Sequence, residues 1–240
     1  MTADGWTRAV RHQLGLGRLL PLGGARDGAW IAEQAAVTAL ERAADGMPGV
    51  RLGALRIALA DPARAQEPVV PPPPSALSPG ALRVTAEFAA TAAEPLPSVA
   101  DRLRSALAEA ATEGLGLTVT EVDLRVTALL EEAPEAAPQR QQEPPSARGP
   151  ADGDESRAAR AALAVPGVVG LAGAPVGLGR PVHIEERPAE AALPARHVRL
   201  ELAVAADHRA VEVARAVRAE VTKALPDHPT VAVLVTAVVG

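Results

Sequence analysis

The clearest pattern in the chain is the alternation of apolar and polar residues at positions 82–88. Every second residue is apolar, and the residues between them are polar or charged: Leu82, Val84, Ala86 and Phe88 alternate with Arg83, Thr85 and Glu87. Successive side chains of a strand point to opposite faces, so this pattern predicts a strand with one face on a core and one in water. Residues 198–204 repeat the alternation and predict a second such strand.

Other strands are predicted from weaker patterns. Residues 50–60 and 117–130 are both strand-like. In 117–130 the apolar phase slips between Val119 and Val122, which predicts a bulge or a bend. Residues 231–239 are apolar on both faces, which is typical of a strand that is well covered in its own fold or that is buried by a partner.

Two amphipathic helices are predicted in the first half of the chain. The first begins at Asp27, whose carboxylate is a favourable N-cap, and ends before Pro48. Ser98 and Asp101 have the spacing of a capping box and predict the start of the second helix. That helix is expected to end by Gly116, because glycine is unfavourable in a helix interior.

The second half has a similar series of elements. A helix is expected over roughly 156–164, and residues 181–186 are expected to extend a sheet before a proline-containing loop at 188–194. Asp207 is a favourable N-cap for a second helix, which Pro226 ends.

A short motif occurs twice. In each copy an Ala-rich helical stretch is followed by a hydrophobic residue, Pro, Gly and Val, and then by a strand. The four-residue step is Met47 to Val50 in the first copy and Val165 to Val168 in the second. Each copy is followed by an alternating strand, a second helix and a last Val-rich strand. The repetition predicts a duplicated helix-strand-strand-helix-strand module.

We therefore expect an α+β fold of two tandem modules, each a small sheet with two helices mainly on one face. Module 1 covers residues 27–131 with a proline-rich insertion at 61–80, and module 2 covers 156–240. Residues 132–155 form a flexible acidic and proline-rich linker, and residues 1–26 a basic N-terminal segment. The alternative is a single split domain with one continuous sheet, against which the long polar linker argues.

Two segments leave alternatives open. Near the N-terminus, Trp6, Val10 and Leu14 form a helical stripe. It fits a helix packed on its own domain or one that docks on a membrane surface or a partner. The insertion contains Pro71 to Pro74 and is expected to be a semi-rigid spacer, with a ligand for a proline-binding partner as the alternative.

Composition narrows the classes of function. Apolar residues make up 48% of the chain but aromatic residues only 1%, so the cores must be built from Ala, Val and Leu. A formal net charge of -5 and few aromatic side chains disfavour a nucleic-acid-binding protein. The absence of cysteine excludes disulfides, thiolate metal sites and a cysteine nucleophile. No apolar run of the length of a transmembrane helix is found, so we expect a cytoplasmic protein.

The sequence predicts no catalytic, cofactor-binding or metal-binding residues. The histidines are scattered and have no metal-ligand spacing: His12, His183, His197, His208 and His228. His183 and Glu185 would share a face of one short strand, with Glu186 beside them, but two ligands do not complete a metal site. The glycine-rich turn at 177–179 lacks the third glycine and the strand-turn-helix context of a phosphate-binding loop.

Arginines recur on equivalent helices of the two modules, Arg102 and Arg104 in the first and Arg209, Arg215 and Arg218 in the second. Solvated helix faces explain them. The alternative is a surface for an acidic partner or a phosphate backbone.

Three sequence features together resemble the bacterial alkaline shock protein family. They are the Pro-Gly-Val step, the segment Leu-Pro-Ser-Val-Ala and the strand Gly-Leu-Thr-Val-Thr-Glu-Val-Asp-Leu-Arg-Val. The resemblance is best over residues 30–131 and looser over 156–239. The matching positions are structural in character: Pro48, Gly49, Val50, Pro97, Val99, Val119, Val122 and Val126. The proline insertion, the lack of tyrosine and the duplication depart from the family pattern.

The resemblance implies a non-enzymatic interaction or scaffold protein linked to a cell-envelope or general stress response. It implies protein partners, including a membrane-anchor protein, and a location in the cytoplasm or at the inner face of the membrane. Self-association is a further option, and no cofactor is expected. The alternatives are a small-molecule-sensing regulatory module and, less favoured, a nucleic-acid-binding protein.

Overall fold

The computed structural model describes residues 17–131, 153–172, 180–189 and 192–240. Its strands are β1 (Leu19–Pro21), β2 (Ala29–Ala32), β3 (Val50–Leu59), β4 (Leu82–Thr91), β5 (Val119–Leu130), β6 (Val168–Leu171), β7 (Val182–Ala189), β8 (Ala192–Ala205) and β9 (Thr230–Val239). Its helices are α2 (Glu33–Asp45), α3 (Leu96–Glu109), α4 (Asp154–Leu163) and α5 (Ala210–Ala224).

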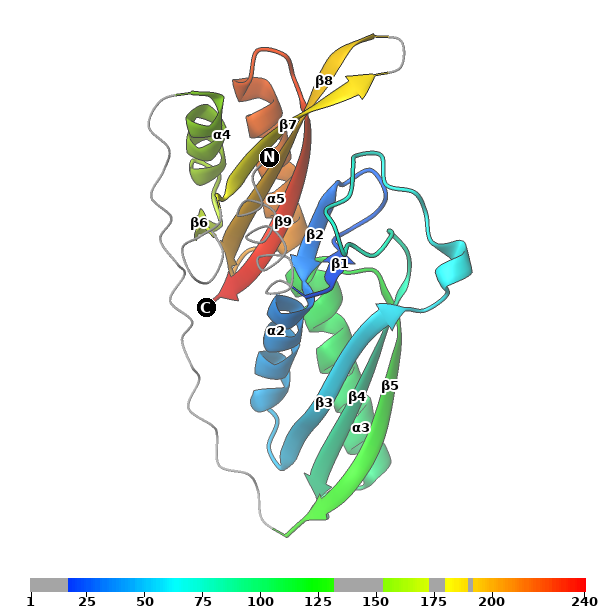
Figure 1. Cartoon of the computed structure of the whole chain (residues 1–240). Coiled ribbons are helices and arrows are strands. Elements are labelled where there is room, and N and C mark those ends of the chain that lie inside the picture. The colour runs from blue at the N-terminus through cyan, green and yellow to red at the C-terminus, as the bar shows by residue number, and fades with distance from the viewer. Residues whose placement is uncertain (1–16, 132–152, 173–179, 190–191) are drawn as a thin grey trace, which may run out of the picture.

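The fold is α+β, as the sequence predicts, and contains two sheets (Figure 1). The small sheet has the order β3-β4-β5. The large sheet has the order β1-β2-β9-β8-β6, and β7 also pairs with β8.

The two halves of the chain have the same connectivity. In the first half the order is α2-β3-β4-α3-β5, with β3 antiparallel to β4 and β4 parallel to β5. In the second half α4-β6-β8-α5-β9 has the same two pairing directions. β6 and β7 pair with successive parts of β8, so together they take the place that β3 has in the first half. A common origin of the halves stays a prediction.

The two Pro-Gly-Val steps form the same turn. The N–H of Val50 donates to the carbonyl of Met47, and that of Val168 to Val165, at 3.3 and 3.2 Å. Gly49 and Gly167 have φ angles of 70° and 88°, in the left-handed region that glycine tolerates best.

Each turn is also tied to the strand that follows in its sheet. The carbonyl of Gly49 accepts from the Thr91 N–H and that of Gly167 from the Ala205 N–H, both at 2.9 Å. Each motif thus joins a helix end to the far end of the central strand of its half.

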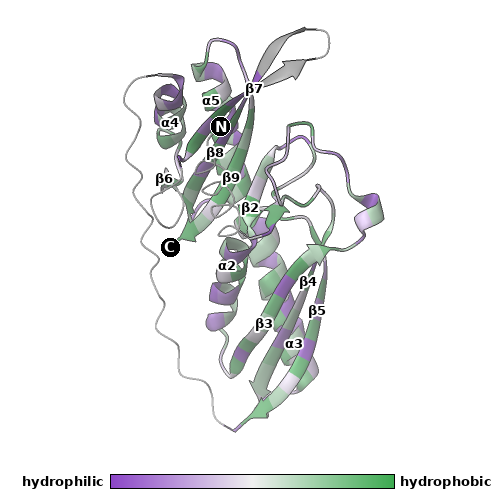
Figure 2. Cartoon of the chain, viewed as in Figure 1, coloured by the Kyte–Doolittle hydropathy of each residue, from purple (hydrophilic) through white to green (hydrophobic). Residues whose placement is uncertain are grey.

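The predicted alternation, with one face in water, is confirmed in β4 but not in β8, where Glu201 is also buried, at 1% exposed. The apolar positions of β4 are fully buried, and the polar positions between them are partly or fully exposed. Figure 2 shows hydrophobic and hydrophilic residues interspersed along the strands of this sheet. The apolar positions of β8, from Val198 to Val204, are also fully buried. The predicted bulge in β5 is present, because the register with β4 shifts between Val119 and Glu121.

The helix predicted from Asp27 is wrong at its start. Residues Ala29–Ala32 form β2, which pairs in parallel with β9, and α2 begins at Glu33. Trp30 and Ile31 are buried in this sheet, so pairing with β9 prevails over the local helical pattern. The first half of the chain thereby contributes β1 and β2 to the large sheet, and the predicted start of module 1 at residue 27 lies between these strands.

Two other predicted helix caps are also wrong. α3 begins at Leu96, two residues before Ser98, because Pro97 is favourable in the first turn of a helix. Its expected capping residue, Asp101, instead pairs with Arg104. α5 begins at Ala210, and the Asp207 carboxylate contacts His208 Nδ1 at 2.8 Å instead of capping that helix.

Proline does not interrupt the sheet where a loop is predicted at 188–194. β7 and β8 continue through most of this region as an antiparallel hairpin. Several other predictions lie outside the described residues: the helical stripe within residues 1–16, most of the linker, and the glycine-rich turn at 177–179.

The proline-rich insertion packs against the rest of the fold. Val70 is buried, and the Val69 N–H donates to the Ala25 carbonyl at 2.9 Å. Trp30 Nε1 donates to the Leu77 carbonyl at 3.2 Å. The insertion therefore covers β1, β2 and the loop between them, near the place where the two halves meet.

Candidate functional site

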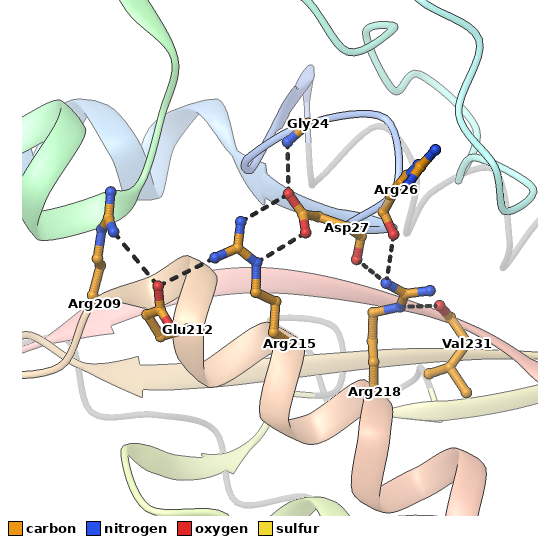
Figure 3. A network of polar contacts seen from close by, with 8 residues as sticks. All are labelled: Gly24, Arg26, Asp27, Arg209, Glu212, Arg215, Arg218 and Val231. Atoms are coloured by element: carbon orange, nitrogen blue, oxygen red, sulfur yellow. Dashed lines mark hydrogen bonds and ion pairs between the residues drawn. The ribbon is translucent and has the colours of Figure 1, made fainter.

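The main polar network of the described residues joins the loop between β1 and β2 to α5 (Figure 3). Arg215 donates to both carboxylate oxygens of Asp27, at 2.9 and 3.0 Å. The Gly24 N–H donates to the same carboxylate at 2.7 Å. This network, which we call the junction, connects residues 188 positions apart in the chain.

Arg218 and Arg209 extend the junction through backbone carbonyls. Arg218 donates to the carbonyls of Arg26 and Asp27 in the loop and to that of Val231 at the start of β9. Arg209 donates to the carbonyl of Thr112, in the π-helical turn after α3, at 2.9 Å. These bonds tie α5 to the backbone of the β1–β2 loop, of β9 and of the turn after α3.

The charges of the junction stabilise one another. The hydrogen bond from Arg215 lowers the pKa of Asp27 below its ordinary value, and the Gly24 N–H adds to this effect. The same bond raises the pKa of Arg215. Burial lowers the pKa of Arg218, but an arginine stays charged at neutral pH.

A shallow hollow lies beside the junction on the outer side of α5. Its volume is about 380 Å³, and it is lined by Arg215, Arg218, Ala219, Thr222, Lys223 and His228. Of these, Lys223 is exposed, while His228 Nδ1 lies 3.1 Å from the Thr222 carbonyl oxygen. The lining is basic, so an anion is the ligand that its charge favours.

The arginines that the sequence singles out are not simply solvated. Arg215 and Arg218 on α5 bind the β1–β2 loop and the start of β9, and Arg209, just before α5, binds the turn after α3. Arg102 pairs with Glu94, and Arg104 binds Asp101 and the Val122 carbonyl. The repetition of arginine on equivalent helices is visible in the sequence. The partners of Arg209 and Arg215 are not, because Thr112 and Asp27 lie 97 and 188 positions away in the chain.

The histidines and acids considered as metal ligands lie on paired strands. His183 lies opposite Arg199, and Glu185 opposite His197, across β7 and β8. His197 Nδ1 lies 2.8 Å from Thr230 Oγ1, which anchors this ring to β9. Within the described part of the chain, no group of three or more His, Asp or Glu side chains is placed to hold a metal ion.

One face of the small sheet is covered by no helix of the described residues. α2 and α3 pack on the face that contains Val84 and Phe88. The other face carries ion pairs between neighbouring strands: Arg83 binds Glu121 and Asp123, and Arg125 binds Glu87. Both charge signs are therefore exposed on this face, at fixed spacing along the strands.

β5 is the outer strand of this sheet, and it is exposed along most of its length. The side chains of Asp123 and Arg125 are 62% and 76% exposed. Val126 and Leu129, on the same strand, are among the large apolar side chains left exposed. Nothing in the alternation of the sequence distinguishes such an edge strand from one with two neighbours.

No helix of the described residues is long and apolar enough to cross a membrane. Comparison with protein-family models, with curated proteins and with solved structures finds no match. The resemblance to alkaline shock proteins therefore stays a prediction.

Proposed function

We propose that this chain is a non-enzymatic interaction or scaffold protein that binds other proteins through its small sheet. The observation that carries the proposal is the uncovered, charged face of that sheet together with the exposed strand β5. Ordered ion pairs on a sheet face with an open edge suit a surface that recognises a partner by charge and by strand pairing.

The junction supports this proposal. Its arginines are occupied by loop carbonyls and by Asp27, so they hold the two halves together. A scaffold benefits from such a connection, because a fixed arrangement of the halves lowers the entropy lost on binding. The link to a cell-envelope or general stress response rests on the resemblance and is proposed with it.

The test is proximity labelling in the native cell with the wild-type chain and with Asp123→Arg. Reversing this exposed charge should remove the specific partners and leave the labelling background. Glu220→Arg is the matched control, since it makes the same charge change on an exposed position of α5. Equal labelling by all three chains, or no specific partner for the wild type, would contradict the proposal.

The stress link needs a separate test. A strain without the gene should grow normally in standard medium and poorly under alkaline or envelope stress. Growth equal to that of the parent under all of these stresses would remove the stress link but would leave the interaction role standing.

The hollow beside α5 favours a second candidate function, the sensing of a small anionic molecule. Lys223 and Arg218 supply positive charge in a space of about 380 Å³. A saturating anion should raise the melting temperature of the wild type. Lys223→Ala should lose that increase, whereas Asp123→Arg should keep it. If no member of a panel of anionic metabolites shifts the melting temperature, this candidate fails.

A further inference from the structure

The open edge of β5 presents backbone groups that no other described strand uses. Among the described strands β5 pairs only with β4. Arg104 Nε donates to the Val122 carbonyl at 3.3 Å, so this carbonyl points away from β4. Since the groups of alternate residues in a parallel strand point to the same side, Leu124 and Val126 also face the open edge.

The part of this edge that is regular is short. Register shifts after Val119 and after Val126 leave residues 121–126 as an unbroken segment. Its even positions, Val122, Leu124 and Val126, lie on the core side of the sheet, opposite Val84, Ala86 and Phe88. Its odd positions, Glu121, Asp123 and Arg125, lie on the charged face.

We infer that β5 pairs antiparallel with β5 of a second copy of this chain, with Leu124 at the two-fold axis. Asp123 then lies opposite Arg125 of the second copy, and Arg125 opposite its Asp123. On the other face Val122 lies opposite Val126, which is 41% exposed in the single chain. The inference rests on the proposed function and specifies it by naming a second copy as a partner.

Charge selects this register over its neighbours. If the two-fold axis passed through Asp123 or Arg125, that residue would face the same charged residue of the second copy. If it passed through Val122, Glu121 would face Asp123, which has the same charge. If the axis passed through Val126, no pair of opposite charges would form between the two copies. A shift of one strand by one residue relative to the other would place its apolar side chains opposite charged ones, because successive side chains point to opposite faces. Only the register centred on Leu124 joins opposite charges and no like charges, and such cross-strand pairs stabilise antiparallel sheets.

The pairing would close the more open edge of the small sheet. The other edge, β3, already has its Ile57 carbonyl occupied by Arg18 at 2.7 Å. Arg104 could keep its ion pair with Asp101 while the Val122 carbonyl accepts from the Val126 N–H of the second copy. The two small sheets would then form one continuous sheet of twice the width.

The first test is a charge-reversal cycle measured by sedimentation over a concentration series. Asp123→Arg and Arg125→Asp each place like charges opposite each other, so each variant should raise the dimer dissociation constant about tenfold or more. Mixing the two variants should restore the dimer, because every cross-strand pair then joins opposite charges. The double variant should also dimerise, and circular dichroism should show that all three chains are folded.

The second test uses the absence of cysteine from the chain. A cysteine at Leu124 should form a disulfide with its equivalent under mild oxidation. A cysteine at the exposed position Glu121 should not, because its equivalent would lie about 20 Å away, at about 3.4 Å per residue.

A wild type that stays monomeric at every concentration would overturn the inference. A dimer that neither charge variant weakens, or one that forms a disulfide at position 121 and not at 124, would also overturn it. A monomeric chain that still labels specific partners in the cell would leave the proposed function intact, so the two failures are distinguishable.

Discussion

Asp27 illustrates how the role of one residue depends on groups that are remote in the sequence. Its carboxylate precedes an apolar periodic stretch, which favours an N-cap. In the structure the same carboxylate accepts two bonds from Arg215 and one from Gly24, in the turn that precedes β2. Its side chain is only 18% exposed, so these bonds are better shielded from water than an ordinary surface ion pair.

Asp27→Ala should therefore lower the free energy of unfolding by about 1–2 kcal/mol. The variant loses a charge-assisted pair and leaves the Gly24 N–H and the Arg215 guanidinium without their partner. Chemical denaturation measures this loss. Asp207→Ala is the control, because that carboxylate is 79% exposed and pairs with its neighbour His208, so it should cost less than half as much.

The contribution of Asp27 should depend on pH in one direction. Its pKa in the folded chain lies below the ordinary value of 3.8 because Arg215 donates to it. The stabilisation is therefore fully present above about pH 5 and is lost as the pH falls below 3.8 toward the folded pKa. The difference in unfolding free energy between wild type and Asp27→Asn should shrink over that acidic range. A difference that is constant with pH would contradict the assigned ion pair.

Among the elements, the two Pro-Gly-Val steps form equivalent turns, and each turn contains a glycine in the left-handed region. Gly49→Ala and Gly167→Ala should each lower the free energy of unfolding by about 1–3 kcal/mol, since an added Cβ is strained at positive φ. The Cβ would also lie 2.6 Å from Thr91 Oγ1 at position 49 and 2.7 Å from Val213 Cγ2 at position 167. Thermal or chemical unfolding measures the loss.

Gly46→Ala is the matched control for these two substitutions. Gly46 has a φ of -76°, and no atom lies close to the position of an added Cβ. This change should leave the stability of the chain nearly unaltered. A similar loss at positions 46 and 49 would show that the left-handed turn is not the cause.

The alternation in β4 makes a second prediction at this scale. Val84→Asp places a carboxylate on a fully buried position and should cost about 3–5 kcal/mol. Thr85→Asp, one residue further along the strand, lies on the exposed face and should cost much less. Equal losses in denaturation experiments would refute the assignment of the strand faces.

At the scale of the whole molecule, the described parts of the two halves form one connected structure. β1 and β2 belong to the first half of the chain but complete the sheet of the second. β2 leads directly into α2, and α2 also reaches β9, where Arg42 Nη2 donates to the Val238 carbonyl at 3.3 Å. Separating the halves would therefore expose the edge of β9 and break the junction.

Trp30 can report whether the halves unfold together. It is 1% exposed in β2, next to β9, and Trp6 is the only other tryptophan of the chain. In a Trp6→Phe background, the red shift of Trp30 emission should coincide with the loss of far-ultraviolet circular dichroism during denaturation. A Trp30 transition at clearly lower denaturant would mean that β2 leaves the large sheet before the rest unfolds.

The features that could be predicted from the sequence are those that depend on a residue and its near neighbours. They are the faces of β4, the apolar face of β8, the bulge in β5, the end of α2 at Gly46 and the end of α5 before Pro226. Each follows from periodicity or from the limits on glycine and proline. These features could be predicted because their energetic causes lie within a few residues of one another.

The contacts between remote groups could not be predicted and are visible in the folded chain alone. Residues 29–32 form a strand because β9 supplies hydrogen bonds and burial, although their local pattern favours a helix. The arginines of α5 have a structural role because the β1–β2 loop places Asp27 and its backbone carbonyls beside them. β5 has an open edge because no described strand follows it in the sheet. Each of these outcomes depends on pairing between segments that are far apart in the chain, and the local periodicity of a sequence carries no information about such pairing.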